Sequence, residues 1–280
     1  MDGQITLNKL VKRFWKKTSL TWILVLLEGM FLILIPLIIG WAIDDLMQNK
    51  IKGIIQLAAL CFFLLIIGAG RRFYDTRIYS KIYRVVCSEM TLKEFRRKTS
   101  VSKISARTNL FSEFIEFLEN SIPDIVNHLI GLLGTLIIIY FIEIKIFWLC
   151  ITATFITGLI FFVSQSRMLR FYKGQNDEFE NQVALISTKD TKKMKKHFKD
   201  LMLWNIRLSD LETINYSLTW IVLSTALIVS VFFAVSSGST DVGHMITIVI
   251  YVFGFIESIL TFPLYYQQMI RLHDIATRLG

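Results

Sequence analysis

The chain has 280 residues, of which 54% are hydrophobic and only 19% are charged, and its formal net charge is +9. A chain this apolar is neither an ordinary soluble domain nor a disordered protein, because both classes carry more charge. The excess of basic residues would suit nucleic-acid binding, but their placement along the chain gives another explanation.

The first 19 residues form a basic leader. Its apolar residues recur at helical spacing on one face, and lysines occupy most of the rest; the apolar set is Leu7, Leu10, Val11, Phe14 and Trp15. This pattern predicts an amphipathic helix lying flat in the headgroup region, with a disordered basic tail as the alternative. The apolar run that follows is too long for a cleavable signal peptide, so we expect it to remain as a membrane span.

Six long apolar runs follow one another along the chain. They cover residues 20–42, 54–70, 125–142, 146–165, 216–236 and 245–265. With a few flanking residues for the shorter runs, each is long enough as a helix to cross about 30 Å of hydrocarbon. The sequence therefore predicts an all-α, multi-pass membrane protein in which the lipid bilayer is the solvent of six helices.

The basic residues lie mainly in four segments, residues 1–19, 71–124, 166–215 and 266–280. These segments hold 28 of the 31 Lys and Arg, and only Lys50, Lys52 and Lys145 lie elsewhere. Cytoplasmic segments near span ends retain basic residues, so both termini are predicted in the cytoplasm. With no targeting peptide, this bias favours a bacterial cytoplasmic (inner) membrane. It also accounts for the net charge, so no nucleic-acid partner is expected.

The two long segments 71–124 and 166–215 carry apolar residues at helical spacing that continues from the neighbouring spans. We therefore expect helical hairpins that project into the cytoplasm, with polar turns at residues 98–109 and 187–199. The second tip is strongly basic. It suits an acidic partner, anionic lipid headgroups, or a solvated surface with no partner.

The architecture resembles the transmembrane domain of ABC exporters over nearly the whole chain, as one domain of six spans, two cytoplasmic hairpins and short outer loops. In the run PLIIGWAID, Pro36, Gly40 and Asp44 resemble the spaced residues of the family's first span. The last span resembles the family's through Gly243, Tyr251 and Pro263, and it is followed by Ala276 and Arg278 in RLHDIATRL. The resemblance implies a homodimer in which helices are exchanged around a central cavity.

Two features depart from that family. An exporter continues after the position of Arg278 with an ATPase domain, whereas no GxxxxGK[ST] phosphate-binding loop occurs in these 280 residues. The stretch WNIRLSDLE at 204–212 also lacks the acidic residue, glycine and apolar pair common ahead of the fifth span.

We therefore expect an exporter subunit that works with a separately encoded ATPase, with ATP acting only through that partner and no cofactor bound by this chain. The hairpin tips are the expected coupling surface; their candidate residues are Ser102, Lys103, Lys192, Lys193, Lys195 and Lys196. The alternative is a membrane protein without a motor that keeps the exporter scaffold, either an ion-coupled carrier or an assembly or regulatory partner.

A substrate pathway should be marked by polar groups at membrane depth, because a carboxylate there is costly unless it faces water or a partner. Glu28 in the first span and Glu257 in the sixth are predicted at similar depth. A polar stripe beside Glu257 includes Thr247, Tyr251, Ser258 and Thr261. A cavity lined in this way would suit a cationic or amphipathic small molecule. The alternative is that each carboxylate bonds only to a neighbouring helix.

No catalytic or metal-binding motif is found. HExxH and GxSxG are absent, the four histidines lie in four different segments, and the three cysteines form no CxxC pair. We therefore expect no catalytic residues in this chain. For His128, near the inner end of the third span, packing and a role in a proton relay are the two alternatives.

Overall fold

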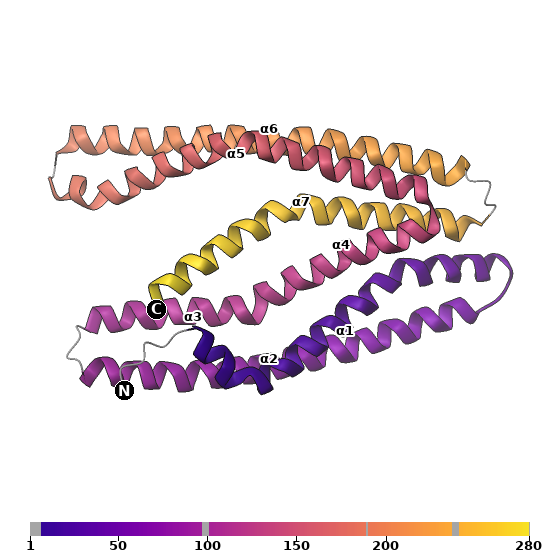
Figure 1. Ribbon diagram of the computed structural model, residues 1–280, viewed down its shortest axis with the longest axis horizontal. Helices are drawn as coiled ribbons and strands as arrows, with labels where there is room; N and C mark the ends of the chain where they lie inside the picture. Colours follow the sequence, from indigo (N-terminus) through magenta and orange to yellow (C-terminus); the bar gives the residue numbers. More distant parts are fainter. Residues whose placement is uncertain (1–6, 97–100, 189, 237–240, 280) are drawn as a thin grey trace. The chain divides into compact units, whose positions relative to one another are not determined.

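All regular elements in the described residues are helices. The computed structural model describes residues 7–96, 101–188, 190–236 and 241–279 (Figure 1). The elements are α1 (Leu7–Met47), α2 (Lys52–Arg96), α3 (Val101–Glu116), the π-helical turn η1 (Phe117–Ser121), α4 (Ile122–Ile142), α5 (Ile144–Ser187), α6 (Thr191–Ser236) and α7 (Val242–Leu279). The predicted all-α fold is confirmed.

Six helical stretches in the described residues are long and apolar enough to cross a membrane, and each contains one of the predicted spans. Large apolar side chains such as Phe62, Leu65 and Phe162 are exposed within them, as expected where lipid is the solvent. Helix α2 has 45 residues and is therefore about 68 Å long, more than twice the hydrocarbon thickness. The protein is an integral, multi-pass membrane protein whose helices continue well beyond their apolar runs.

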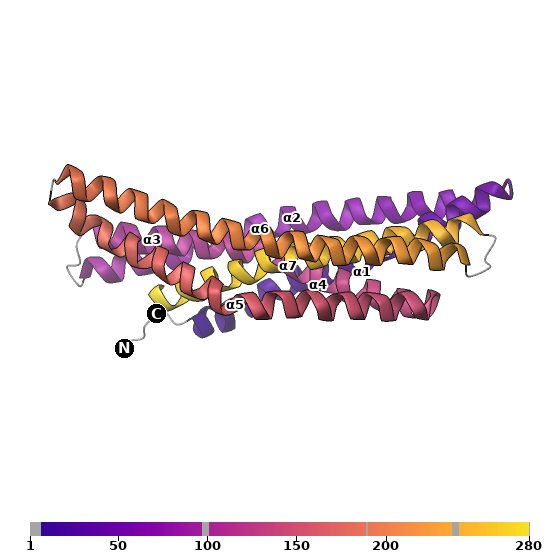
Figure 2. The ribbon, with the colours of Figure 1, turned by 90° about the horizontal axis from the view of Figure 1, so that it is seen from above.

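The chain divides into two compact units, residues 143–233 and the remainder of the chain. In the larger unit, α1 packs against α2, α4 and α7, and α4 also packs against α7. In the smaller unit, α5 and α6 form one antiparallel hairpin and run side by side in both views (Figures 1 and 2).

The C-terminal part of α1 and the start of α7 approach each other at two glycines. A Cβ atom on Gly243 would lie 2.7 Å from Asp44 Cγ and would overlap the carbonyl oxygen of Gly40. A Cβ on Gly40 would lie 2.7 Å from the Gly243 carbonyl oxygen. Gly40 and Gly243, two of the residues that resemble the exporter family, are therefore small because two helix backbones meet there, as is common where helices associate in lipid.

The N-terminal segment is helical from Leu7 and continues directly into the first span. Its first turns run at an angle to the rest of α1 (Figure 1). The hydroxyls of Thr18 and Ser19 donate to carbonyl oxygens three or four residues earlier, an arrangement that bends helices. The side chains of Leu7, Leu10 and Val11 lie outside the described residues.

Phe14 from this segment is buried in protein rather than in the headgroup region expected from the sequence. It joins a cluster, called here the first-hairpin core, of Phe14, Tyr79, Ile82, Val86, Cys87, Met90, Phe111, Phe114 and Ile115. Beside it Arg13 donates two hydrogen bonds to Glu89, at 2.7 and 2.8 Å, and this bonding lowers the pKa of the Glu89 carboxyl. The leader is thus fixed to the first hairpin mainly by burial, because exposed ion pairs contribute little.

Helix α3 of the first hairpin begins earlier than predicted. Residues 101–109, expected as part of a polar turn, already belong to α3, and residues 98–100 of that turn lie outside the described residues. Ile104 is buried in the first turns of α3. This one buried apolar side chain stabilises the start of the helix, although most of the stretch is polar.

Helices α3 and α4 are joined by the wide turn η1, just before Pro123. In this turn the Ile122 N–H bonds to the Phe117 carbonyl oxygen, five residues back. Proline has no N–H, so it cannot continue the regular ladder of hydrogen bonds, and the wider turn accommodates it between the two helices. Thr76 of α2 donates to the Glu119 carboxylate at 2.9 Å and ties the turn to the neighbouring helix.

The α5–α6 hairpin is held by polar contacts at successive levels. From the span ends toward the tip, the pairs are Ser164 with Asn215 at 2.6 Å, Tyr172 with Glu212 at 3.1 Å, Gln175 with Asn205 at 3.3 Å, and Glu178 with His197 at 2.8 Å. Gly174 leaves room between the helices for the Trp204 indole, since a Cβ would lie 2.7 Å from that ring. These contacts fix the two helices in register far beyond their apolar runs.

Candidate functional site

Glu28, the first predicted pathway carboxylate, has a partner in the structure. The Arg71 Nε of α2 lies 2.5 Å from Glu28 Oε2, and Arg71 Nη1 lies 3.3 Å from Asp75 Oδ2. Asp75 also accepts a hydrogen bond of 2.6 Å from the Thr21 hydroxyl. We call Thr21, Glu28, Arg71 and Asp75 the inner charge network. It joins α1 to α2 and holds two carboxylates around one guanidinium.

This network is almost fully enclosed, with side-chain exposures of 8% for Arg71, 13% for Glu28 and 3% for Asp75. Charges withdrawn from water in this way are stable only when they are paired and hydrogen bonded. One signal in the sequence could have indicated this partner of Glu28. Arg71 and Asp75 are four residues apart directly after the second span, so they lie on the same face of the helix. Sequence reasoning assigned them only to a basic loop.

Thr247 and Tyr251 of the polar stripe are buried against α1. Tyr251 donates from its hydroxyl to the Ile33 carbonyl oxygen at 2.7 Å, and Thr247 donates to the Pro36 carbonyl oxygen at 3.2 Å. Both are less than 4% exposed. Each carbonyl oxygen has two lone pairs, so those of Ile33 and Pro36 can accept from side chains of α7 as well as from N–H groups of α1. These two residues connect helices in the structure.

The remaining stripe residues lie further along α7, toward its C-terminal end. Ser258 and Thr261 are partly exposed and donate to carbonyl oxygens of their own helix, those of Gly254, Glu257 and Ser258. Glu257 is exposed, and its carboxylate has no hydrogen-bond or ion-pair partner among the described residues. Nothing lies within 4 Å of a Cβ built on Gly254. Glu257, Ser258 and Thr261 are thus the accessible members of the predicted set, and no bond joins Glu257 to Glu28.

In the first half of α4, the His128 ring contacts the Tyr265 ring of α7, with centroids 5.0 Å apart and the ring planes tilted by 45°. This contact matches the packing alternative. Nearly two turns further along α4, Gly134 accommodates Ile33 of α1, while Gly29 of α1 lies against the side chains of Asn127 and Ile130. These contacts bring α1 and α4 close together and leave the relay role of His128 a prediction.

The C-terminal end of α1 carries two carboxylates that cap other helices. Asp44 Oδ1 accepts from the Gly243 N–H at 2.7 Å at the start of α7, and Asp45 Oδ2 accepts from the Gly53 N–H at 2.8 Å at the start of α2. Capping satisfies N–H groups that have no partner within their own helix and places negative charge at the positive end of each helix dipole. Asp44 of the exporter-like motif therefore fixes where α7 begins.

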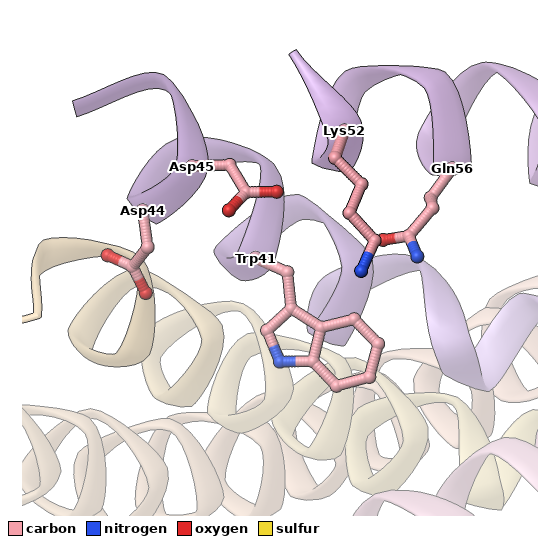
Figure 3. Close-up of a pocket in the computed structure, with 5 residues that line it drawn as sticks. All are labelled: Trp41, Asp44, Asp45, Lys52 and Gln56. Atoms are coloured by element: carbon pink, nitrogen blue, oxygen red, sulfur yellow. The ribbon is translucent and has the colours of Figure 1, made fainter. Parts of the chain in front are cut away.

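A shallow pocket of about 300 Å³ lies beside these caps, lined by Trp41, Asp44, Asp45, Lys52 and Gln56. Figure 3 shows Asp44 and Asp45 on the last turn of α1, with the Asp45 carboxylate directed toward Lys52, the Asp44 carboxylate directed away from it, and the Trp41 indole below. Sequence reasoning did not single it out. Because both carboxylates are occupied by backbone N–H groups, the pocket follows from helix capping.

The second hairpin tip is more compact than the predicted turn at residues 187–199. Helix α5 ends at Ser187 and α6 begins at Thr191. Asp190 makes this possible, because its Oδ1 accepts from the N–H groups of Lys192 and Lys193 at 2.9 and 3.3 Å. Lys192, Lys193, Lys195 and Lys196 are therefore helical and exposed. The side chains of Ser102 and Lys103, candidates at the first tip, lie outside the described residues.

Replacing Arg71 with Met should destabilise the protein by about 3–5 kcal/mol, because Glu28 and Asp75 would be left buried without a counter-charge. Adding Glu28→Gln to Arg71→Met should restore part of the loss. Thermal unfolding of the detergent-purified variants in a double-mutant cycle measures the coupling. Equal stability of Arg71→Met and the parent would contradict the network.

The comparisons with known proteins agree with this architecture. A search of curated proteins found no match. A family model described as the ABC transporter transmembrane region matches residues 7–244, which includes α1 to α6, the caps at Asp44 and Gly243, and both long helical hairpins. The chain belongs to the ABC transporter transmembrane region family.

Proposed function

We propose that this protein is the transmembrane subunit of an ABC exporter, working as a homodimer with an ATPase on a separate chain. The observation that carries the proposal is the family match over residues 7–244, which covers five of the six membrane-length helices and both hairpins. The hairpins supply what a subunit of this kind needs, a stiff connection from the membrane to a soluble motor.

The proposed orientation places both termini and both hairpins in the cytoplasm of a bacterial inner membrane. Its support is the segregation of 28 of the 31 basic residues into the segments that contain the hairpins and the termini. ATP would act only through the partner, since no phosphate-binding loop occurs in these 280 residues and cradling the phosphates requires one. This chain would then bind no cofactor and catalyse no reaction itself.

The proposed homodimer has exchanged helices, as the family resemblance implies. The division of the chain supports it, because α5 and α6 form a compact unit with their own internal contacts. A hairpin that is internally bonded from Ser164 near the span end to His197 near the tip can pack on another subunit without losing its own structure.

The proposed pathway passes the inner half of α7. Glu257, Ser258 and Thr261 are accessible there, and a carboxylate without a partner at membrane depth suits a water-filled cavity and a cationic or amphipathic substrate. Glu28 contributes less directly in this proposal, because its charge is already neutralised by Arg71.

Copurification tests whether the protein works with an ATPase on a separate chain. Full-length protein extracted from its native membrane should bring down an ATPase with a phosphate-binding loop, and the reconstituted pair should hydrolyse ATP faster in the presence of transported substrate. Recovery of a partner of another kind, with no ATPase, would favour the assembly or regulatory alternative over the exporter.

Glu257→Gln should lower transport of a cationic substrate at least tenfold in proteoliposomes while leaving the unfolding temperature unchanged, because the carboxylate is exposed and makes no internal bond. Asp210→Asn is the matched control; it removes an equal charge from an exposed position on α6. Unchanged transport by Glu257→Gln, at every pH tested, would contradict the pathway.

A further inference from the structure

The tip of the α5–α6 hairpin carries a concentrated basic face. Lys192, Lys195, Lys196 and Lys199 lie within the first three turns of α6 and are all exposed. At 100° per residue they fall within one arc of about 100°. The residues that pack against α5, His197, Leu201 and Leu208, are buried on the opposite side. We call these four lysines the tip lysine face.

This face is electrostatically unfavourable for the hairpin alone. Lysines at i, i+3 and i+4 repel one another, and cations in the first turns of a helix oppose its dipole. Asp190 caps the helix and lies 4.0 Å from Lys193, so it does not neutralise the four. None of them forms an ion pair with another residue that the structure describes. A local arrangement that opposes helix stability in this way is expected where a surface serves a contact.

The bilayer that holds the protein is too far away to be that contact. Helix α6 is continuous from Thr191 to Ser236. From Lys199 to residue 216, where the apolar run begins, it rises by about 26 Å, and from Lys192 by about 36 Å. The headgroup layer extends about 6 Å from the hydrocarbon, and charges are screened beyond about 8 Å at physiological salt. If α6 is tilted by 40°, at the upper end for membrane helices, Lys199 still lies about 20 Å above the start of the apolar run, and it is the nearest of the four lysines.

We propose that the tip lysine face binds an acidic surface of a soluble protein partner, and not the headgroups of its own membrane. This inference rests on the proposed function, to which it adds the chemistry of the docking surface. The four ammonium groups extend over about 10 Å of helix, which matches carboxylates spaced at one and two helical turns on a partner. Binding of this kind associates fast and weakens steeply with salt.

The first test uses the full chain in nanodiscs of phosphatidylcholine, with a fluorescent peptide of about 20 glutamates as the acidic probe. Replacing the four lysines with Gln should weaken binding at least tenfold at low salt. The matched control replaces Arg72, Lys81, Arg84 and Lys173 with Gln; all four are exposed and lie elsewhere on the hairpins. It should weaken binding less than twofold. Equal losses in the two variants, or no loss in the tip variant, would overturn the proposal.

Two further outcomes are decisive. The tip variant should unfold at the same temperature as the parent or higher, because lysine repulsion is removed; a lower temperature would show that the face serves the hairpin's own stability. A single-stranded oligonucleotide of equal charge should bind no more tightly than the glutamate peptide. Tighter binding that depends on the same four lysines would assign the face to nucleic acid and overturn the proposal.

A separate experiment tests whether the tip lysine face contacts the membrane. A fluorophore on Lys196→Cys, in a chain with its three natural cysteines replaced, should not be quenched by brominated lipid in vesicles with 30% phosphatidylglycerol. The same label on Ser217→Cys, at the start of the span, should be quenched. Quenching at both positions would overturn the proposal. Copurification of an ATPase is independent of these results, so either proposal can fail alone.

Discussion

The hydrocarbon solvent is the constraint on which the rest of the structure depends. In lipid, a backbone N–H or C=O without a partner costs several kcal/mol, so each crossing segment bonds to itself as a helix. The same solvent removes the hydrophobic force between helices, and large apolar side chains such as Phe62 and Phe162 remain exposed. Helix association must then come from close backbone approach and from polar bonds between helices.

Helix α1 makes most of these bonds in the larger unit, at three levels. At its C-terminal end Asp44 and Asp45 cap α7 and α2. Near its middle the carbonyl oxygens of Pro36 and Ile33 accept bonds from Thr247 and Tyr251. About two turns before Pro36, Glu28 joins the charge network with Arg71. The glycines at 29, 40 and 243 allow the backbones to come close enough for these bonds to form.

The spans and their continuation into the hairpins could be predicted because they depend on the period and length of apolar runs, which are local properties of the sequence. The partners of Glu28, Thr247 and Tyr251 could not, because each lies on a helix distant in sequence, and a polar residue at membrane depth has the same pattern whether it faces a cavity or a carbonyl group. The tips were predicted as polar turns because polar composition cannot separate a capped helix start from a loop. A single contact at each tip decides this, burial of Ile104 in one and capping by Asp190 in the other.

The smaller unit, the α5–α6 hairpin, is also held together by polar bonds between helices. Its polar pairs keep α5 and α6 in register as far as His197, so a force applied at the tip is carried along the whole hairpin rather than lost in a loop. Together with membership of the ABC transporter transmembrane region family, this supports the proposal that the hairpin transmits the work of a soluble motor into the membrane.

The central claim is a six-span chain with its hairpins on the cytoplasmic side. Labelling of Lys50→Cys and Lys192→Cys with a membrane-impermeant thiol reagent, in intact cells and in a chain whose natural cysteines are replaced, tests it most directly. The account predicts that position 50 reacts at once and that position 192 reacts only after the membrane is permeabilised. Reaction of position 192 in intact cells would contradict it.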